Sequence, residues 1–404
     1  MKIGKGTELG KFAIWTAALI LGAALGTLGS ARLDDFFNFV ASAYTRLFQF
    51  IAVPTIALAV TTTLAALGAK RSTGKLFLHT IVYTLLTTLA AALVGLGLYL
   101  LIRPGNLPAD IIAESAGATS HYVPETFYGH VLAVIPNNMV HPFLAGNVLS
   151  ILLVAAAAGF GIATMKDTPE KAALLKGVNG LQELLFTMIK GLVWALPLGI
   201  VAFSAQLAAQ VKTGLDIGSL GKYLAVVLAG NLVQFFVVLP LFLVVRGINP
   251  LRVIRAMSPA VMMALFTKSS AATLPVTVNS AETRLGAKPE VARFVCPICC
   301  TINMNGCAAF ILVTSLFVMQ NGGAALTLPT MLLWVLIACV SAIGNAGVPM
   351  GCYFLTLSLM AGQGMPIGIL GVILPVYAVI DMIETAENVW SDSCVCAMVD
   401  GDLS

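Results

Sequence analysis

A group of polar residues near the C-terminus of this 404-residue chain has the spacing of one helical face. The group consists of Asp381, Glu384, Thr385, Asn388 and Asp392, here called the acidic stripe. At about 100° per residue the five positions fall within an arc of about 100° on a helix. Three carboxylates, an amide and a hydroxyl therefore share one face, and such oxygen donors suit a site for cations.

The sequence before the acidic stripe argues that the stripe is not simply a water-facing surface. Residues 368–380 are apolar and require lipid or protein on every side. A single Asp or Glu in the middle of a bilayer costs roughly 2.5–3.5 kcal/mol. We therefore expect the stripe to face a protein interior or a water-filled cavity, and an ordinary amphipathic helix is the alternative.

The overall composition is that of a polytopic membrane protein. Hydrophobic residues make up 59% of the chain, charged residues only 10%, and the mean hydropathy is +0.95. The net charge of +4 is small and its Lys and Arg residues lie in loops, so nucleic acid is not an expected partner. Apolar runs near residues 12–30, 37–68, 76–102, 140–164, 177–208 and 222–245 predict six spans.

The basic residues predict the orientation of these spans. They gather in the segments 2–11, 70–75, 166–176, 246–255 and 284–293, which all lie on one side if the N-terminus is cytoplasmic. The first apolar run lacks a convincing cleavage site and is taken as a retained span. Both termini are therefore expected in the cytoplasm.

Two later segments predict re-entrant hairpins. The apolar stretch 256–278 lies between basic clusters that belong on the same side, so it should enter and return, with its turn at 267–272. The stretch 323–366 repeats this design around residues 341–351. Helices at 290–320 and 367–399 each follow one hairpin. The fold class is thus all-α, with eight transmembrane helices, two re-entrant hairpins and inverted repeats, an arrangement typical of secondary transporters.

A polar, glycine-containing sequence interrupts the helix predicted at 290–320. It runs from Thr301 to Gly306, and unwinding there would free backbone carbonyls. Asn303, Asn388 and Asp392 together would make an oxygen cage for Na⁺. The alternative is a kink whose polar groups are satisfied by neighbouring helices.

Four motifs of this sequence resemble the dicarboxylate/amino acid:cation symporter family, which includes glutamate and neutral amino acid transporters. They are 268–275, 301–306, 346–349 and 381–392. The resemblance implies a transporter and not an enzyme, located in the cell (inner) membrane as a homotrimer in contact with lipid. It also implies an elevator mechanism that couples the import of an amino acid to Na⁺.

The resemblance further implies a division into a scaffold and a moving transport domain. Helices 1 and 2 (1–75) and helices 4 and 5 (140–208) would form the scaffold. Helix 3 (76–102) and residues 222–404 would form the transport domain. Residues 103–139 would form an exposed outer loop.

The same resemblance assigns residue roles. The substrate would be bound by Ser269, Ser270, Gly347, Val348, Pro349, Asp381, Glu384, Thr385 and Asn388. Sodium would be bound by Thr301, Asn303, Asn388 and Asp392, with Thr87, Thr88 and Asn305 as further candidates.

Two departures from the family pattern bear on substrate and ion. Members that transport acidic substrates carry an Arg where this chain has Glu384, and a carboxylate there would repel an acidic substrate. The chain is similar at this point to bacterial serine/threonine:sodium symporters, which predicts serine and threonine first, then alanine and glycine. A basic or other polar amino acid, proton coupling and, less favoured, a dicarboxylate are the alternatives. Asn305 replaces an Asp of three-sodium relatives, which predicts one or two sodium ions.

The cysteines raise the alternative of a membrane-embedded enzyme or redox protein. All eight lie between Cys296 and Cys396, and we expect reduced thiols that fill space in or beside the membrane. The sequence Cys296–Cys300 resembles a metal or redox motif but has no partner motif and no nearby His.

A channel is another alternative to a carrier. A channel would need a continuous polar path, whereas the two hairpin tips are expected to occlude the site.

Overall fold

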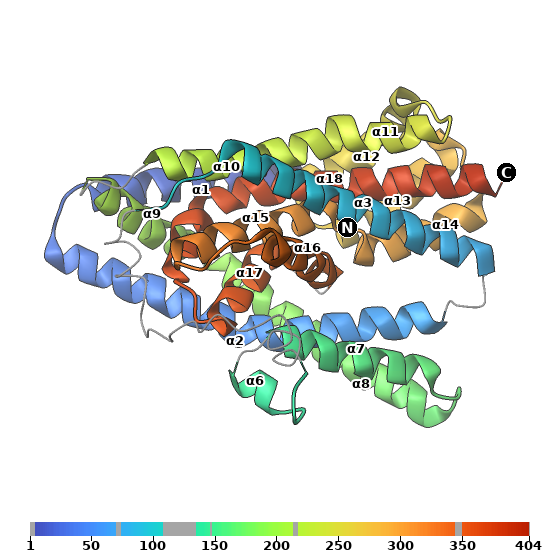
Figure 1. Ribbon diagram of the computed structural model, residues 1–404, viewed down its shortest axis with the longest axis horizontal. Coiled ribbons are helices and arrows are strands. Elements are labelled where there is room, and N and C mark those ends of the chain that lie inside the picture. Colours follow the sequence, from blue (N-terminus) through green and yellow to red (C-terminus); the bar gives the residue numbers. More distant parts are fainter. Residues whose placement is uncertain are drawn as a thin grey trace.

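The computed structural model describes residues 5–69, 74–107, 135–145, 148–212, 217–343 and 350–403, and within these ranges the chain forms helices joined by short connections, with no strand (Figure 1). The prediction of an all-α chain is confirmed. Most of the outer loop expected at 103–139 lies outside the described residues.

The helices follow the predicted spans closely, and several spans are divided into two. The first half of the chain contains α1 (Lys5–Gly26), α2 (Ala31–Ala69), α3 (Gly74–Ile102), α6 (His141–Ala145), α7 (Val148–Thr164), α8 (Pro169–Trp194) and α9 (Leu196–Lys212). The second half contains α10 (Ile217–Val233), the π-helix η2 (Gln234–Val238), α11 (Leu239–Val245), α12 (Pro250–Thr267), α13 (Ser270–Ser280), η3 (Ala281–Leu285), α14 (Pro289–Ile302), α15 (Asn305–Asn321), α16 (Leu328–Ile343), α17 (Gly351–Gly362) and α18 (Gly368–Asp402).

The helices pack mainly as two groups. Helix α1 packs on α9, and α2 packs on α7, α8 and α9. In the other group α15 lies at the centre, against α3, α10, α16, α17 and α18, while α12 and α14 pack on α18 (Figure 1). Fewer pairs, such as α17 with α2 and α18 with α9, connect the groups. The division into a scaffold and a moving transport domain stays a prediction.

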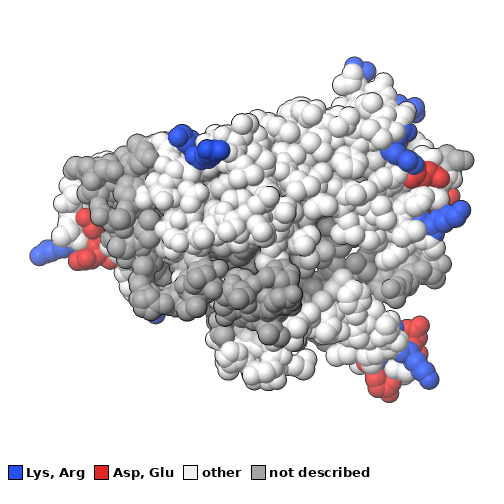
Figure 2. Space-filling view, viewed as in Figure 1, with Lys and Arg blue, Asp and Glu red and all other residues white. Residues whose placement is uncertain are grey.

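The outer surface is apolar over its middle part. Large side chains in the middle of the long helices, such as Phe236, Leu85 and Leu93, are 67%, 53% and 44% exposed. On the face in Figure 2 the charged residues gather mainly towards the two ends of the long axis. Among the described residues, three helical stretches are long and apolar enough to cross a membrane, namely Gly74–Ile102, Gly218–Val245 and Pro289–Asn321, and the bent pair Gly368–Leu374 and Val379–Asp402 would be a fourth if it forms one span. A surface of this kind suits lipid better than water.

Helices α12 and α13 form a helical hairpin with a tight turn. Lys268 ends α12 in the left-handed conformation (φ 52°), and Ser269 begins α13 as its N-cap, accepting a hydrogen bond from the amide of Ala272. The turn is therefore shorter than the predicted 267–272, because residues from Ser270 onward are already helical. The capping hydroxyl lets the second helix start at once.

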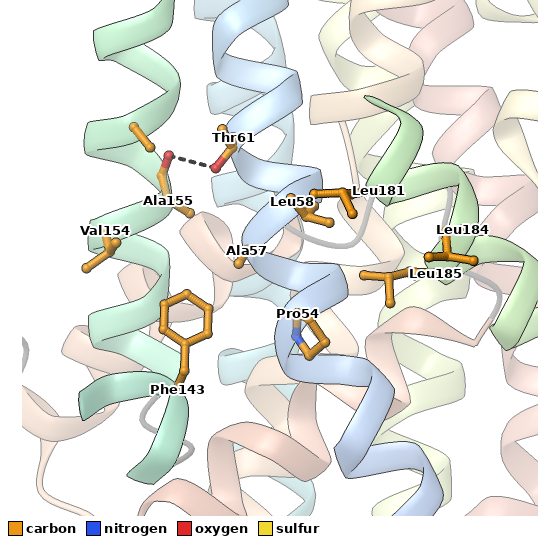
Figure 3. A pocket seen from close by; sticks show the side chains of 11 residues that line it. Pro54, Ala57, Leu58, Thr61, Phe143, Val154, Ala155, Leu181, Leu184 and Leu185 are labelled. Atoms are coloured by element: carbon orange, nitrogen blue, oxygen red, sulfur yellow. Dashed lines mark hydrogen bonds between the residues drawn. The ribbon is translucent and has the colours of Figure 1, made fainter. Parts of the chain in front are cut away.

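A groove between α2, α6, α7 and α8 is apolar, in contrast to the acidic stripe. Its volume is about 410 Å³, and its lining includes Pro54, Phe143 and Leu184 (Figure 3). Thr61 is its polar residue, and the Thr61 hydroxyl donates to the carbonyl of Ala155 at 3.2 Å. The groove therefore offers apolar contact and no charge to a ligand.

Glycines bring α1 and α9 into backbone contact. A Cβ atom added at Gly22 would lie 2.3 Å from the carbonyl oxygen of Val201, and one added at Gly26 would lie 2.1 Å from that of Ala205. Small residues four apart allow this kind of close helix packing in membranes. The N-terminal helix is therefore positioned by the absence of two side chains.

The replacement Gly22→Ala should destabilise the protein, because the new methyl group has no space unless α1 moves away from α9. Overpacking of this kind costs about 1–3 kcal/mol. The measurement is thermal unfolding in detergent, with Gly161→Ala in α7 as the matched control, since no atom lies within 4 Å of a Cβ added there. Equal unfolding midpoints for the two variants would contradict the close packing.

Candidate functional site

The helix break predicted between Thr301 and Gly306 is present. Helix α14 ends at Ile302, α15 begins at Asn305, and Asn303 and Met304 have non-helical backbone angles (φ −96°, ψ 72° and φ −107°, ψ 68°). Asn303 and Asn305 are completely buried. The break therefore places two amide side chains inside the protein, where each must find hydrogen-bond partners.

These amides find their partners on the second half of the acidic stripe. Asn303 donates to Asp392 Oδ1 at 3.0 Å and to the Ser391 hydroxyl at 2.9 Å. Asn305 donates to the same hydroxyl at 2.6 Å and to the side-chain Oδ1 of Asn303 at 2.9 Å. We call Asn303, Asn305, Ser391 and Asp392 the amide cluster. It connects the break to α18 through side chains alone.

Two further elements reach the amide cluster. The Thr87 hydroxyl of α3 donates to Asn303 Oδ1 at 3.0 Å. Gln234, at the start of η2, donates to Asn305 Oδ1 and to the backbone carbonyl of Thr87, both at 3.1 Å. Four segments thus meet here: α3, η2, the break between α14 and α15, and α18. The π-helix η2 lies between α10 and α11, and it starts at the residue, Gln234, whose polar side chain points into the protein.

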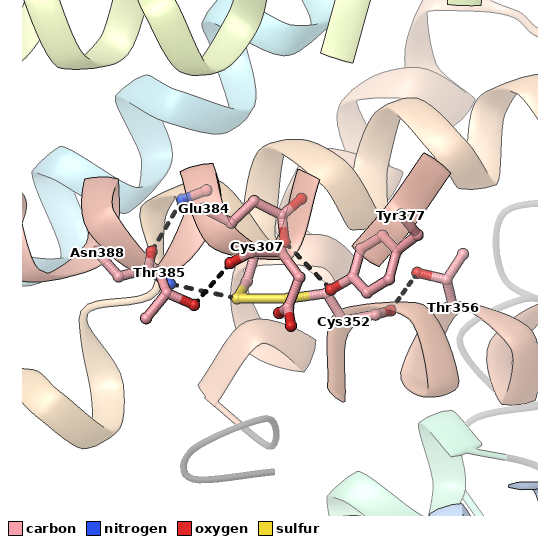
Figure 4. Close-up of a disulfide and its surroundings, with 9 residues drawn as sticks. Cys307, Cys352, Thr356, Tyr377, Glu384, Thr385 and Asn388 are labelled. Carbon is pink, nitrogen blue, oxygen red and sulfur yellow. Dashed lines mark hydrogen bonds between the residues drawn. A yellow bond between two sulfur atoms is a disulfide. The ribbon is translucent and has the colours of Figure 1, made fainter. Parts of the chain in front are cut away.

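The first half of the acidic stripe forms a second, adjoining region (Figure 4). Asn388 accepts the backbone N–H of Gly306 at 3.0 Å, and the Tyr377 hydroxyl donates to Glu384 at 3.2 Å. Asp381, Glu384, Thr385 and Asn388 are all buried, with exposed fractions of 7%, 1%, 7% and 3%. The prediction that the stripe faces the interior is therefore confirmed by its burial.

Gly306 allows α15 to lie directly against α18. A Cβ atom at this position would be 2.9 Å from the Cα of Glu384 and 3.1 Å from the side-chain oxygen of Asn231. The missing side chain lets the Gly306 amide reach Asn388. The glycine in the broken helix thus has a packing role in addition to any role in unwinding.

Several oxygens of the stripe are buried without a hydrogen-bond partner. They are Asp381 Oδ2, Glu384 Oε1 and both carboxylate oxygens of Glu387. An unpaired buried carboxylate is costly, so such atoms indicate a missing cation or hydrogen-bond donor. The charge of Lys268, at the α12–α13 turn, acts on Asp381. The open oxygens of Asp381 and Glu384 can accept an ammonium or hydroxyl group of a ligand.

The remaining predicted site residues have mixed placements. The Thr301 hydroxyl donates to the carbonyl of Ile298 in its own helix, and the Thr88 hydroxyl is buried without a partner. Ser269 caps α13, and Ser270 lies in the first turn of that helix. Gly347, Val348 and Pro349 lie outside the described residues.

Sequence reasoning missed Ser391, Gln234, Asn231 and Tyr377. Ser391 lies about 80° from the start of the stripe at the angle of an ideal helix, so the spacing argument passed over it. Gln234 and Asn231 are buried polar residues in an apolar span. That pattern could have identified them, because amides are rarely placed at membrane depth without a reason.

The expectation of eight reduced cysteines is wrong for one pair. Cys307 in α15 and Cys352 in α17 form a disulfide (Figure 4). Six other cysteines have free thiols, among them Cys296, Cys299 and Cys300, which are buried. The pairing was not visible in the sequence because the two residues are 45 positions apart and meet only when α15 and α17 pack.

Long apolar helices around a buried acidic site at a helix break are features of a secondary membrane transporter. Residues 12–401 match the sodium:dicarboxylate symporter family, and the chain belongs to this family. It is therefore a member of a family of membrane transporters, as its four motifs predicted.

Relatives over most of the chain include neutral amino acid transporters and excitatory amino acid transporters. The neutral amino acid transporter B(0) of Oryctolagus cuniculus is 28% identical over 421 residues, covering 93% of this chain and 77% of the relative. The excitatory amino acid transporter 3 of Mus musculus is 27% identical over 432 residues, covering 93% and 82%. An uncharacterized symporter of Haemophilus influenzae is 26% identical over 372 residues, covering 88% and 83%.

Replacing Ser391 by Ala should weaken the amide cluster, because Asn303 and Asn305 would each lose one acceptor. An unsatisfied buried donor costs about 1–3 kcal/mol. Thermal unfolding in detergent measures the loss. Ser393→Ala is the matched control, since that hydroxyl donates only to the Val389 carbonyl of its own helix, at 2.7 Å. If both variants unfold at the same temperature, the cluster does not have this role.

Proposed function

We propose that this protein is a sodium-coupled symporter that imports small neutral amino acids, with serine and threonine preferred over alanine and glycine. The observation that carries the proposal is the placement of Glu384, buried beside Asp381 and bonded through one oxygen to Tyr377. Its other oxygen, Oε1, has no partner. That oxygen is an acceptor for a substrate hydroxyl.

The charge of this region bears on the substrate class. Asp381 would bind the substrate ammonium through its open oxygen, and Asn388 would bind the carboxylate through its amide nitrogen. A substrate with a second carboxylate would meet Glu384, and two like charges in a buried site repel strongly. This argument disfavours aspartate, glutamate and C4 dicarboxylates.

The amide cluster supports sodium coupling. Asn303 and Asp392 are already hydrogen-bonded, and Asn388 is joined to the same break through Gly306. Na⁺ prefers oxygen donors, and these residues together with Thr301 and the freed backbone of the break would supply them. Thr87, Thr88 and Asn305 are the further candidates; Asn305 brings no charge, which favours one or two coupled ions.

The wider architecture belongs to the same proposal. We infer a homotrimer in the inner membrane with both termini in the cytoplasm. In it, α12–α13 and α16–α17 would be re-entrant hairpins, and the group around α15 would move against a scaffold of α1, α2 and α7–α9. The sparse packing between the two groups supports such an elevator motion.

A basic amino acid is the second candidate substrate. The same unpartnered Glu384 oxygen that could accept a hydroxyl could also pair with a cationic side chain. Serine and threonine are placed first because the sequence around Glu384 and Thr385 resembles the serine/threonine:sodium symporters, and because Glu384 already accepts a hydroxyl hydrogen bond from Tyr377 at 3.2 Å.

A thermal-shift panel of the twenty amino acids, with sodium or with choline, tests the proposal. A ligand that binds only the folded state raises the unfolding temperature, by an amount equivalent to about 2.7 kcal/mol at a hundred times its dissociation constant. We expect shifts for serine and threonine that require sodium. A shift that is as large in choline, or one that only glutamate produces, would reject the assignment.

Two substitutions in the stripe should separate substrate binding from sodium binding. Asp381→Asn should abolish serine binding, because it removes the charge that holds the ammonium group. Asp392→Asn should chiefly raise the sodium concentration needed for binding. Uptake in proteoliposomes, measured over a range of sodium concentrations, checks both. Normal serine uptake at normal sodium in both variants would show that the residues are misassigned.

Glu384→Arg should shift the preference towards acidic substrates, since a guanidinium can bind a carboxylate through two parallel hydrogen bonds. We expect measurable aspartate binding and a loss of serine binding of at least about tenfold, equivalent to 1.4 kcal/mol. Calorimetric titration with both amino acids measures this change, and Glu384→Gln is the control that removes the charge alone. An unchanged ranking of the two substrates would contradict the role of Glu384.

A further inference from the structure

The disulfide between Cys307 and Cys352 joins two helices at the wall of the candidate site. Cys307 is in the first turn of α15 and Cys352 is in the first turn of α17. Their Cα atoms are 5.4 Å apart, within the range of about 4.4–6.8 Å that a disulfide requires. The backbones are therefore already placed for the bond and need not move to form it.

The bond belongs to the neighbourhood of the acidic stripe. Asn388 donates to Cys307 Sγ at 3.5 Å, and the amide that Asn388 accepts is that of the preceding residue, Gly306. One carboxylate oxygen of Glu384 lies within 4.8 Å of both sulfur atoms. Figure 4 shows the bond directly beside Glu384, Asn388 and Tyr377. Forming or breaking this bond would therefore change the surroundings of Glu384 and Asn388 in the acidic stripe.

The site is closed in this conformation. Asp381, Glu384, Thr385 and Asn388 are at most 7% exposed, so a solute cannot reach them unless one wall moves. Helix α15 is held against α18, because Gly306 and the amide cluster bond its first turn to that helix. Helix α17 packs on both α15 and α18. Its first turn is linked to α18 by the Tyr353 hydroxyl, which donates to the Leu370 carbonyl, and to α15 by the disulfide.

We propose that Cys307 and Cys352 form a thiol–disulfide switch that controls access to the substrate site, an inference that rests on the proposed function. In the oxidised protein the covalent bond clamps α17 to α15 and keeps the site closed. In the reduced protein van der Waals contacts hold α17 to α15 and the Tyr353–Leu370 hydrogen bond holds it to α18, so α17 can separate from α15 to admit a solute.

The redox step balances as ordinary thiol–disulfide exchange. Oxidation removes one proton from each thiol and two electrons in all, and a small-molecule disulfide such as oxidised glutathione accepts them, leaving as two thiols. A dithiol reductant reverses the reaction when slow local opening of the oxidised protein exposes the bond. The pair is buried, so exchange requires the transient opening that the reduced protein undergoes during transport, and the oxidant traps the closed form.

Sodium-driven uptake of labelled serine in proteoliposomes tests the switch. The purified protein is divided into a sample treated with oxidised glutathione and a sample treated with a dithiol, and mass spectrometry of peptides measures the Cys307–Cys352 link in each. We expect uptake at least about tenfold faster in the reduced sample, which corresponds to 1.4 kcal/mol between open and closed forms. Equal rates with the link fully formed, or failure of the link to form, would overturn the proposal.

Two variants identify the cysteines responsible. In Cys352→Ser the ratio of reduced to oxidised uptake should fall to one, whatever the absolute rate. In Cys339→Ser, which removes a free thiol in α16, the ratio should stay as in the unaltered protein. A ratio that persists in Cys352→Ser would show that other cysteines cause the response, and would overturn the assignment.

Hydrogen exchange over Gly351–Gly362 tests the clamp without any substrate. Amides of α17 should exchange faster after reduction, because the helix can then separate locally from α15. Equal exchange in the two samples would overturn the clamp. If exchange changes while neither sample transports any of the twenty amino acids, the switch stands and the proposed substrate class fails.

Discussion

The structure depends on one constraint, that amides, hydroxyls and carboxylates buried among apolar helices must bond to each other. Asn303 and Asn305 interrupt a stretch of 33 residues that is otherwise long and apolar enough to span a membrane. Asp392 and Ser391 of α18 supply the acceptors for both. Because an unpaired buried polar group is costly, these hydrogen bonds fix the register of α15 against α18. The packing of α3 and η2 follows from it, since Thr87 and Gln234 complete the same network.

The same constraint explains why part of the stripe is left incomplete. Where the amide cluster satisfies its own members, Asp381, Glu384 and Glu387 each retain at least one oxygen without a partner. A protein interior tolerates such atoms where they serve binding, because a ligand then provides the compensation. Under the proposed function the amide cluster is the support of the site and the incomplete carboxylates bind the ligand. Among the described residues, Glu387 has no hydrogen-bond partner at either oxygen.

Much of the fold and of the site could be predicted from sequence. Hydropathy placed the long apolar helices, and helical periodicity gathered Asp381, Glu384, Thr385 and Asn388 on one buried face. Sequence patterns did not predict contacts between residues that are far apart in the chain. The Cys307–Cys352 bond depends on how α15 and α17 pack, and Gln234 is oriented by a π-helix that no composition rule predicted. The turn at Lys268 was also placed too broadly, because the capping hydroxyl of Ser269 starts the next helix earlier than the polar composition suggested.

The end of α18 is anchored as firmly as its middle. Asp402 pairs with Arg246 of the α11 end and accepts the Tyr83 hydroxyl of α3 at 2.6 Å, while Lys288 donates to the Leu403 carbonyl at 2.8 Å. The helix that carries the stripe is thus held at its far end by segments from three other parts of the chain. Its final residues therefore hold α3, α11 and the start of α14 against α18. Removing the last helical turn would break these contacts, and α18 would then be less well positioned even at residues that do not contact the deleted ones.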